Sequence, residues 1–167
     1  MGYTHYWQKT DVAPPPEAFG RTALDAKKII AAAKKQGIAI VDLQGTPKSK
    51  PEFTEAHFSF NGPRPDDDYE SFWFDAVSDG FAFCKTAYRP YDAVVCAVLI
   101  SAAAHYGPAL DVSSDGSWDV EDEWALGQAL FTEVFGVEPV KPSGVKTGAQ
   151  REAEYAAWRA EREAVSR

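Results

Sequence analysis

The chain has 167 residues, a length that suits one domain with its own hydrophobic core. Hydrophobic residues make up 45% and charged residues 25%, as in an ordinary globular protein, and aromatic residues reach 13%, enough to fill a core and also line a binding surface. The formal net charge of -8 disfavours general contact with phosphate backbones, so no nucleic acid is expected as a partner.

Two features of the sequence predict a soluble protein of the cytoplasm. No uninterrupted run of about 18 apolar residues is present, and the first ten residues lack the charged and apolar regions of a signal peptide, so no membrane contact is expected. Cys84 and Cys96 sit among apolar neighbours, which favours two buried, reduced thiols over a disulfide.

The N-terminal part predicts a strand, a helix and two further strands. Bulky residues at 3–7 predict a short strand. Apolar residues spaced three and four apart predict a helix over about 16–36, which Gly37 ends. An apolar run predicts a buried strand at 38–43, and alternation predicts a half-buried strand at 56–60.

The middle of the chain predicts an α+β fold. Alternation at 71–75 and at 81–86, together with the strand at 56–60, predicts an antiparallel meander. The segment 90–106 is apolar nearly all round, so it is expected to be a central, buried helix. A short strand at 110–113 and a third helix at 121–135 complete a single domain over residues 1–136.

The C-terminal part differs in composition from this domain. Residues 137–148 are rich in Pro, Gly and Lys and predict a linker. Residues 149–167 predict a charged helix or tail whose large apolar residues are Tyr155 and Trp158. We expect this segment to be separable from the domain.

The segment FCKTAYRPYD, residues 83–92, carries the clearest chemical signal. A strand ends at Thr86 and a helix begins near Pro90, so Lys85 and Arg89 supply positive charge beside a helix N-terminus, which suits an anion. The alternative is structural: Asp92 caps the helix, Lys85 lies in solvent and Arg89 pairs with an acid.

No metal and no cofactor are expected from the sequence. His5 and His57 lie on predicted strands and could face one pocket, but no HxH, HxxxH or CxxC spacing supports a metal site. Residues 111–122 superficially match a calcium loop, yet Asp122 is too short for the usual bidentate ligand and Trp118 replaces a small residue. A strand, a turn and an acidic helix start explain that segment better.

Three stretches together resemble a family of small uncharacterised proteins encoded by bacteriophages and bacteria. They are GYTHYW at residues 2–7, FCKTAYRPYD at 83–92, and VSSDGSW at 112–118 followed by EW at 123–124. The resemblance extends to about residue 135 and implies an origin rather than a chemistry. The family pattern often reads KTARKPYD, and Tyr88 here stands in place of the first basic residue of that pattern.

These observations predict a phage-encoded, non-enzymatic accessory protein in the host cytoplasm, which binds a host protein or a small anionic ligand such as a nucleotide. One alternative is a small enzyme acting on a nucleotide or phosphoester, and another is a structural or assembly protein. In the ligand-binding case, the rings of Tyr3, Trp7, Trp73 and Trp118 would stack on a base. The predicted ligand-binding residues are His5, Trp7, Lys85, Thr86, Arg89, Tyr91, Asp92, Ser113 and Asp115.

Overall fold

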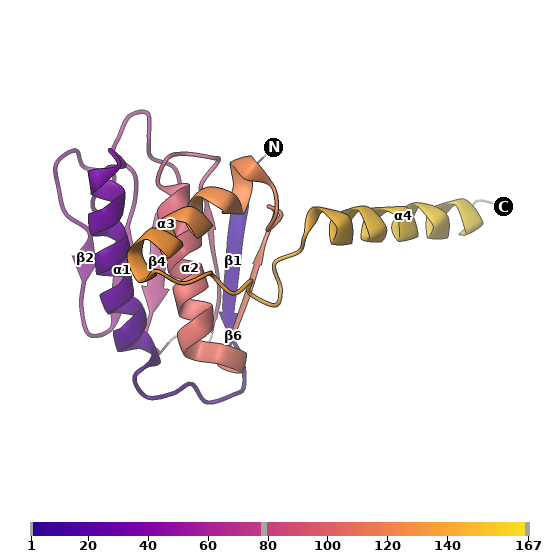
Figure 1. Cartoon of the computed structure of the whole chain (residues 1–167), viewed down its shortest axis with the longest axis horizontal. Coiled ribbons are helices and arrows are strands. Elements are labelled where there is room, and N and C mark those ends of the chain that lie inside the picture. Colours follow the sequence, from indigo (N-terminus) through magenta and orange to yellow (C-terminus); the bar gives the residue numbers. More distant parts are fainter. Residues whose placement is uncertain (1, 78–79, 166–167) are drawn as a thin grey trace.

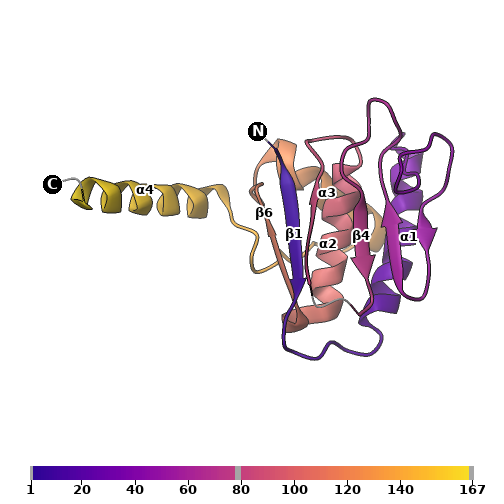
Figure 2. The same ribbon diagram turned by 180° about the vertical axis from the view of Figure 1, so that it is seen from behind.

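The computed structural model describes residues 2–77 and 80–165, and this part of the chain has the expected α+β fold. Two three-stranded antiparallel sheets lie side by side in one layer, and helices cover one face of that layer (Figure 1, Figure 2). The first sheet has the order β5 (Phe81–Lys85), β1 (Thr4–Lys9), β6 (Leu110–Ser114), and the second has the order β2 (Glu52–Phe53), β3 (His57–Phe60), β4 (Phe72–Asp75).

The expected meander is present in the second sheet but does not include β5. Strands β3 and β4 pair with Phe58 opposite Phe74. The next strand, β5, lies close to β4 but pairs with β1, where Cys84 is opposite His5. Strand β1 is bonded to β5 on one edge and to β6 on the other, so the backbone groups of this buried strand are satisfied on both sides.

The segment 38–43 does not form the expected buried strand. Of its residues only Val41 is fully buried, and Val41 makes an isolated bridge to Asn61. Pairing stops there because Asp42 turns the chain: its backbone N–H donates to Ser49 and its carboxylate accepts from the N–H of Thr46. The apolar run therefore packs as an extended loop.

Helix α2 (Asp92–Tyr106) is the central, buried element that the sequence predicts. It packs between α1 (Ala18–Lys35) and α3 (Leu126–Phe135), and a π-helical turn at Glu121–Ala125 leads into α3. Together with the 3-10 turn that follows it, α2 forms a helical segment, Asp92–Ala109, that is apolar and long enough to cross a membrane, but this segment is mostly buried inside the domain, as in the core of a soluble protein.

Buried phenylalanines of the second sheet belong to the same hydrophobic core as the buried residues of these helices. Fully burying one such ring contributes about 1.5–3 kcal/mol to stability. The buried rings of the second sheet are Phe58, Phe60, Phe72 and Phe74.

The chain after α3 runs back along β6 before it leaves the domain. Gly144 forms a bridge with Ser113, the N–H of Trp118 donates to the carbonyl of Lys146 at 2.9 Å, and Val145 is fully buried. Helix α4 (Gly148–Val165) then extends away from the domain, and none of its described residues is buried (Figure 1). Positions 166–167 of the expected C-terminal helix lie outside the described residues.

Candidate functional site

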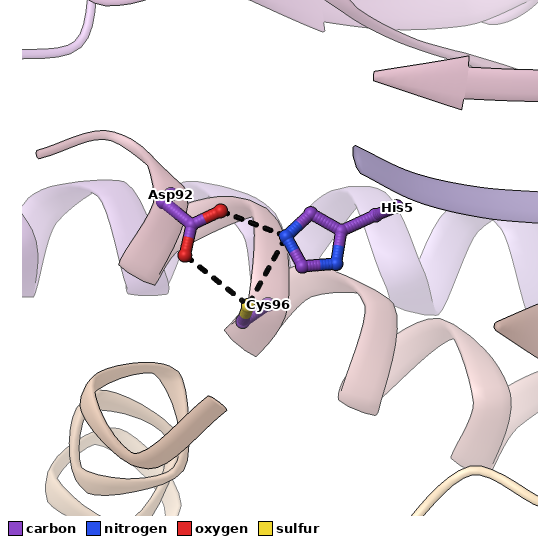
Figure 3. Close-up of side chains that lie close together, drawn as sticks. All are labelled: His5, Asp92 and Cys96. Atoms are coloured by element: carbon purple, nitrogen blue, oxygen red, sulfur yellow. Dashed lines mark hydrogen bonds and ion pairs between the residues drawn. The ribbon is translucent and has the colours of Figure 1, made fainter. Parts of the chain in front are cut away.

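A cluster of polar side chains lies inside the core, between β1 and the first turns of α2 (Figure 3). His5 has no exposed surface, and its Nε2 lies 2.7 Å from Oδ1 of Asp92. The hydroxyl of Thr86 donates to the same carboxylate oxygen at 2.5 Å. The Sγ of Cys96 lies 3.7 Å from Oδ2 of Asp92 and 3.6 Å from Nε2 of His5. We call His5, Thr86, Asp92, Cys96 and Ser114 the buried cluster.

Secondary-structure periodicity brings these side chains together. Alternation along β1 turns His5 toward the helices, as it does Tyr3 and Trp7. Asp92 and Cys96 are four residues apart, so they share one face of α2. Asp92 makes no capping bond at the start of this helix, because its carboxylate is turned to His5 and Thr86 instead.

Ser114 extends the cluster on the other side of His5. Its Oγ lies 3.0 Å from Nδ1 of His5 and accepts a hydrogen bond from the N–H of Gly116 at 2.9 Å. A carboxylate can only accept, so Nε2 of His5 carries the proton that reaches Asp92, and Nδ1 accepts from the Ser114 hydroxyl. Ser114, His5 and Asp92 thus form a continuous hydrogen-bonded chain.

Such a chain activates a serine for attack where a substrate can reach the hydroxyl. Here Ser114 is only 9% exposed, and its oxygen already accepts from Gly116. Arg151 from α4 covers the same turn, where its guanidinium donates to the carbonyl of Gly116 at 2.8 Å. The arrangement therefore suits a fixed, enclosed polar site better than a nucleophile.

Tyr3 borders the cluster, is only 1% exposed, and has a hydroxyl with no well-formed hydrogen bond apart from its interaction with the Cys96 thiol. Burial raises the pKa of the Tyr3 phenol, and the nearby Cys96 raises it further. Burial likewise raises the pKa of the Cys96 thiol, and the charge of Asp92 adds to the effect. Both groups are therefore neutral at physiological pH.

The turn between β5 and α2 is strained beside this cluster. Ala87 and Tyr88 have φ angles of 50° and 61°, in the left-handed region that costs a non-glycine residue about 1–2 kcal/mol. The Tyr88 ring stacks on Tyr3 at 4.2 Å between centroids, which helps to offset the strain. Tyr88 thus packs over Tyr3 at one side of the cluster.

The structure brings together only some of the predicted ligand-binding residues. His5, Thr86 and Asp92 meet in the buried cluster. Asp115 lies at its edge, where it accepts from the N–H of Thr4 and the hydroxyl of Tyr6, each at 3.1 Å. These contacts hold β1 in place.

The other predicted residues lie elsewhere. Trp7 packs in the core against Phe72, with 4.8 Å between ring centroids, and the buried Tyr91 donates its hydroxyl to the carbonyl of Glu70 at 2.6 Å. Ser113 is exposed on β6. The remaining two cations point away from the cluster: the Lys85 ammonium lies over the Tyr69 ring, and Arg89 is exposed.

The rings expected to stack on a base are also apart. Tyr3 and Trp7 are buried, Trp118 packs against Trp124, and Trp73 is exposed and stacks on His57. His57 belongs to the second sheet and does not face His5.

Two members of the cluster, Cys96 and Ser114, are not among the ligand-binding residues predicted from the sequence. The spacing of Asp92 and Cys96 carries a signal, because residues four apart share a helix face. For Ser114 no such signal exists, because its contact with His5 joins positions 109 residues apart.

Neither protein-family models, nor curated proteins, nor solved structures give a match to this chain. The resemblance to phage and bacterial proteins remains a prediction.

Proposed function

We propose that this protein is a non-enzymatic binding protein that engages a partner protein through helix α4. One observation carries the proposal: α4 is an 18-residue helix with no buried residue, yet it presents two large aromatic side chains. Tyr155 is 61% exposed and Trp158 48% exposed, and their rings stack at 5.7 Å. Aromatic anchors of this kind dominate the binding energy of protein interfaces.

The root of α4 is fixed to the domain, which supports a role as a presented helix. Thr147 and Gln150 form a capping box, in which the backbone N–H of each residue donates to the side chain of the other. The N–H of Gly148 donates to Asp119 at 2.7 Å, and Arg151 binds the carbonyl of Gly116. These contacts favour helix formation in a segment that would be marginal alone, and they project about 27 Å of helix into solvent.

The apolar stripe of α4 favours binding to a groove on a different protein over pairing with a second copy of this chain. Tyr155, Trp158 and Val165 lie on one side of the helix, and the guanidinium of Arg162 lies 4.8 Å from the Trp158 ring centre on the same side. Pairing of two such stripes would bring arginines together in a coiled-coil core. A partner with an apolar groove and an acidic rim would accept the aromatic rings and Arg162 together.

The partner class follows from the resemblance to phage-encoded proteins, which makes a host protein in the cytoplasm the natural occupant. A small anionic ligand is less well supported, since Lys85 and Arg89 lie outside the buried cluster. An enzyme is also less well supported, since the hydrogen-bonded series of Ser114, His5 and Asp92 is enclosed by the protein.

Photo-crosslinking followed by a direct affinity measurement tests the proposal. A photoreactive residue in place of Tyr155 identifies the protein that α4 contacts in host cells, and that protein is then purified and titrated with the full chain. We expect Trp158→Ala to weaken its affinity about 30-fold or more, because a central aromatic anchor contributes about 2 kcal/mol or more.

The matched control is Ala160→Gln, which changes the opposite face of the same exposed helix and keeps helix propensity. We expect this variant to bind like the wild type. Equal affinities for the wild type and Trp158→Ala would contradict the proposal, as would a crosslinked protein that does not bind the purified chain.

A further inference from the structure

We propose that the buried cluster binds a zinc ion through Nε2 of His5, a carboxylate oxygen of Asp92 and Sγ of Cys96 (Figure 3). The three donor atoms lie within 4.8 Å of one another, and all three residues are buried. No property of α4 enters this inference, so it stands independently of the proposed function.

The two distances from the sulfur of Cys96 to the other donor atoms fit a tetrahedral zinc site. Zn–N and Zn–O bonds of about 2.0–2.1 Å and a Zn–S bond of about 2.3 Å place sulfur about 3.6 Å from the other two donors in a tetrahedron. The Sγ of Cys96 lies 3.6 Å from Nε2 of His5 and 3.7 Å from Oδ2 of Asp92. The hydrogen bond of 2.7 Å between Nε2 of His5 and Oδ1, the other oxygen of Asp92, would break when the ion binds Nε2.

Ligation through Oδ2 would leave Oδ1 with a partner, the hydroxyl of Thr86. On the other side, a zinc-binding histidine donates its second ring N–H to an acceptor, and Ser114 Oγ lies 3.0 Å from Nδ1 of His5. Metal binding would release the Cys96 thiol proton to solvent and move the ring proton of His5 from Nε2 to Nδ1, whose N–H would then donate a hydrogen bond to the Ser114 oxygen. The groups around the donors are thus suited to both the metal-free and the metal-bound form.

The buried hydroxyl of Tyr3 also lies beside the proposed site, next to the Cys96 thiol. Tyr3 is buried, its ring meets the His5 ring edge-on at 4.9 Å between centroids, and its hydroxyl has no well-formed hydrogen bond apart from its interaction with the Cys96 thiol. A buried polar group without a well-formed hydrogen bond calls for an explanation, such as an ion or a water. A zinc ion bound to Cys96 would place a charged partner close to this hydroxyl.

The donor set selects zinc over the hard cations, since thiolate and imidazole are poor ligands for calcium and magnesium. His5 lies on β1, and Asp92 and Cys96 lie on α2, so the ion would join the central strand to the central helix. An enclosed site of this kind is structural rather than catalytic. The sequence does not reveal this site, because His5 and Cys96 are 91 residues apart and share no motif.

Cobalt substitution tests the site in the full-length protein. The chain is stripped with a chelator and titrated with Co²⁺, which reports tetrahedral thiolate ligation through intense visible bands and a near-ultraviolet sulfur-to-metal charge-transfer band. We expect saturation at about one Co²⁺ per chain and loss of both bands when Zn²⁺ is added. Zinc should also raise the melting temperature of the stripped protein.

The chain offers a matched control in its second buried cysteine. Cys96→Ala should lose the charge-transfer band, and Cys84→Ala should keep it, because the thiol of Cys84 donates to the carbonyl of Glu70 outside the cluster. A wild-type protein without the charge-transfer band would overturn the proposal, and so would an undiminished band in Cys96→Ala. If Cys96→Ala does not fold, the cobalt spectra of the wild type and of His5→Gln test the site instead. We expect the charge-transfer band in the wild type and a weakened band in His5→Gln.

Discussion

Asp92 is the residue on which the buried cluster depends, because three of its neighbours direct donors at one carboxylate. His5 and Thr86 both donate to Oδ1, and the Cys96 thiol lies near Oδ2. In a buried site, each donor left without its acceptor costs about 1–3 kcal/mol. The cluster therefore stabilises the contact between β1 and α2 only while all of its members are present.

Asp92→Ala should lower the free energy of unfolding by about 2–5 kcal/mol, since it leaves His5 and Thr86 without an acceptor. Asp92→Asn keeps the shape and one acceptor, so it should lose less. Urea unfolding with a chelator present measures the effect without any metal contribution. Asp111→Ala is the control, because Asp111 is an exposed acid on β6 and its loss should change stability by about 0.5 kcal/mol or less. Similar losses at both positions would contradict the assigned role of Asp92.

At the scale of elements, the helices are predictable from sequence because their signals are local. The apolar spacing within 16–36 and the all-round apolar character of 90–106 correspond to α1 and α2, which the structure confirms within two residues. Strand partners are not local, so the pairing of β5 with β1 could not be read from the meander pattern. The apolar run at 38–43 was misleading because burial of Val41 alone does not require a strand.

Strand β5 shows a second limit of pattern reading. Its alternation is real, but the small residue Cys84 faces the core while Phe81 and Phe83 are exposed on the outer face. The hydrophobic pattern therefore locates the strand without giving its inward side. The same limit affects the candidate site: His5, Thr86 and Asp92 could be predicted, but their contacts with Cys96 and Ser114 depend on tertiary structure.

The C-terminal segment has two parts that should respond differently to truncation. Truncation after Thr147 removes α4, which has no buried residue, and should change the free energy of unfolding by about 1 kcal/mol or less. Truncation after Gly136 also removes the fully buried Val145 and the carbonyl of Lys146 that accepts from Trp118. That shorter chain should lose about 2–4 kcal/mol.

Thermal and urea unfolding of the two truncated chains distinguish these cases. Equal stability of both chains would show that residues 137–147 act as a free linker. A large loss on removal of α4 alone would show that Tyr155 and Trp158 dock on the domain in solution.

At the scale of the whole molecule, helices cover one face of the sheet layer and leave the other face open (Figure 2). The exposed aromatic residues Phe81 and Phe83 lie on that open face, and α4 extends beyond the domain. The core between the layer and the helices holds two buried phenols, Tyr91 and Tyr106, and the buried thiol of Cys84, all with raised pKa values. This core therefore links the stability of the entire fold to high pH.

Burial raises the pKa of the Tyr106 phenol to about 12, and it raises the pKa of Tyr91 and of the Cys84 thiol even further. In the unfolded chain these groups have their ordinary pKa values of 10.0 and 9.0. Above about pH 9 the unfolded state therefore releases protons that the folded state retains, so stability is full below that pH and falls as pH rises. We expect the free energy of unfolding to decline steadily from there to about pH 12.

Tyr106→Phe provides the decisive comparison for this prediction. The Tyr106 hydroxyl is buried without a hydrogen-bond partner, so its removal should raise stability by about 1 kcal/mol at neutral pH. It also removes one group that ionises only on unfolding, so the decline in alkali should be less steep than in the wild type. Urea unfolding across the alkaline range, with phenolate absorbance recorded in parallel, measures both effects. Parallel pH profiles for the two proteins would show that the Tyr106 phenol already ionises in the folded state.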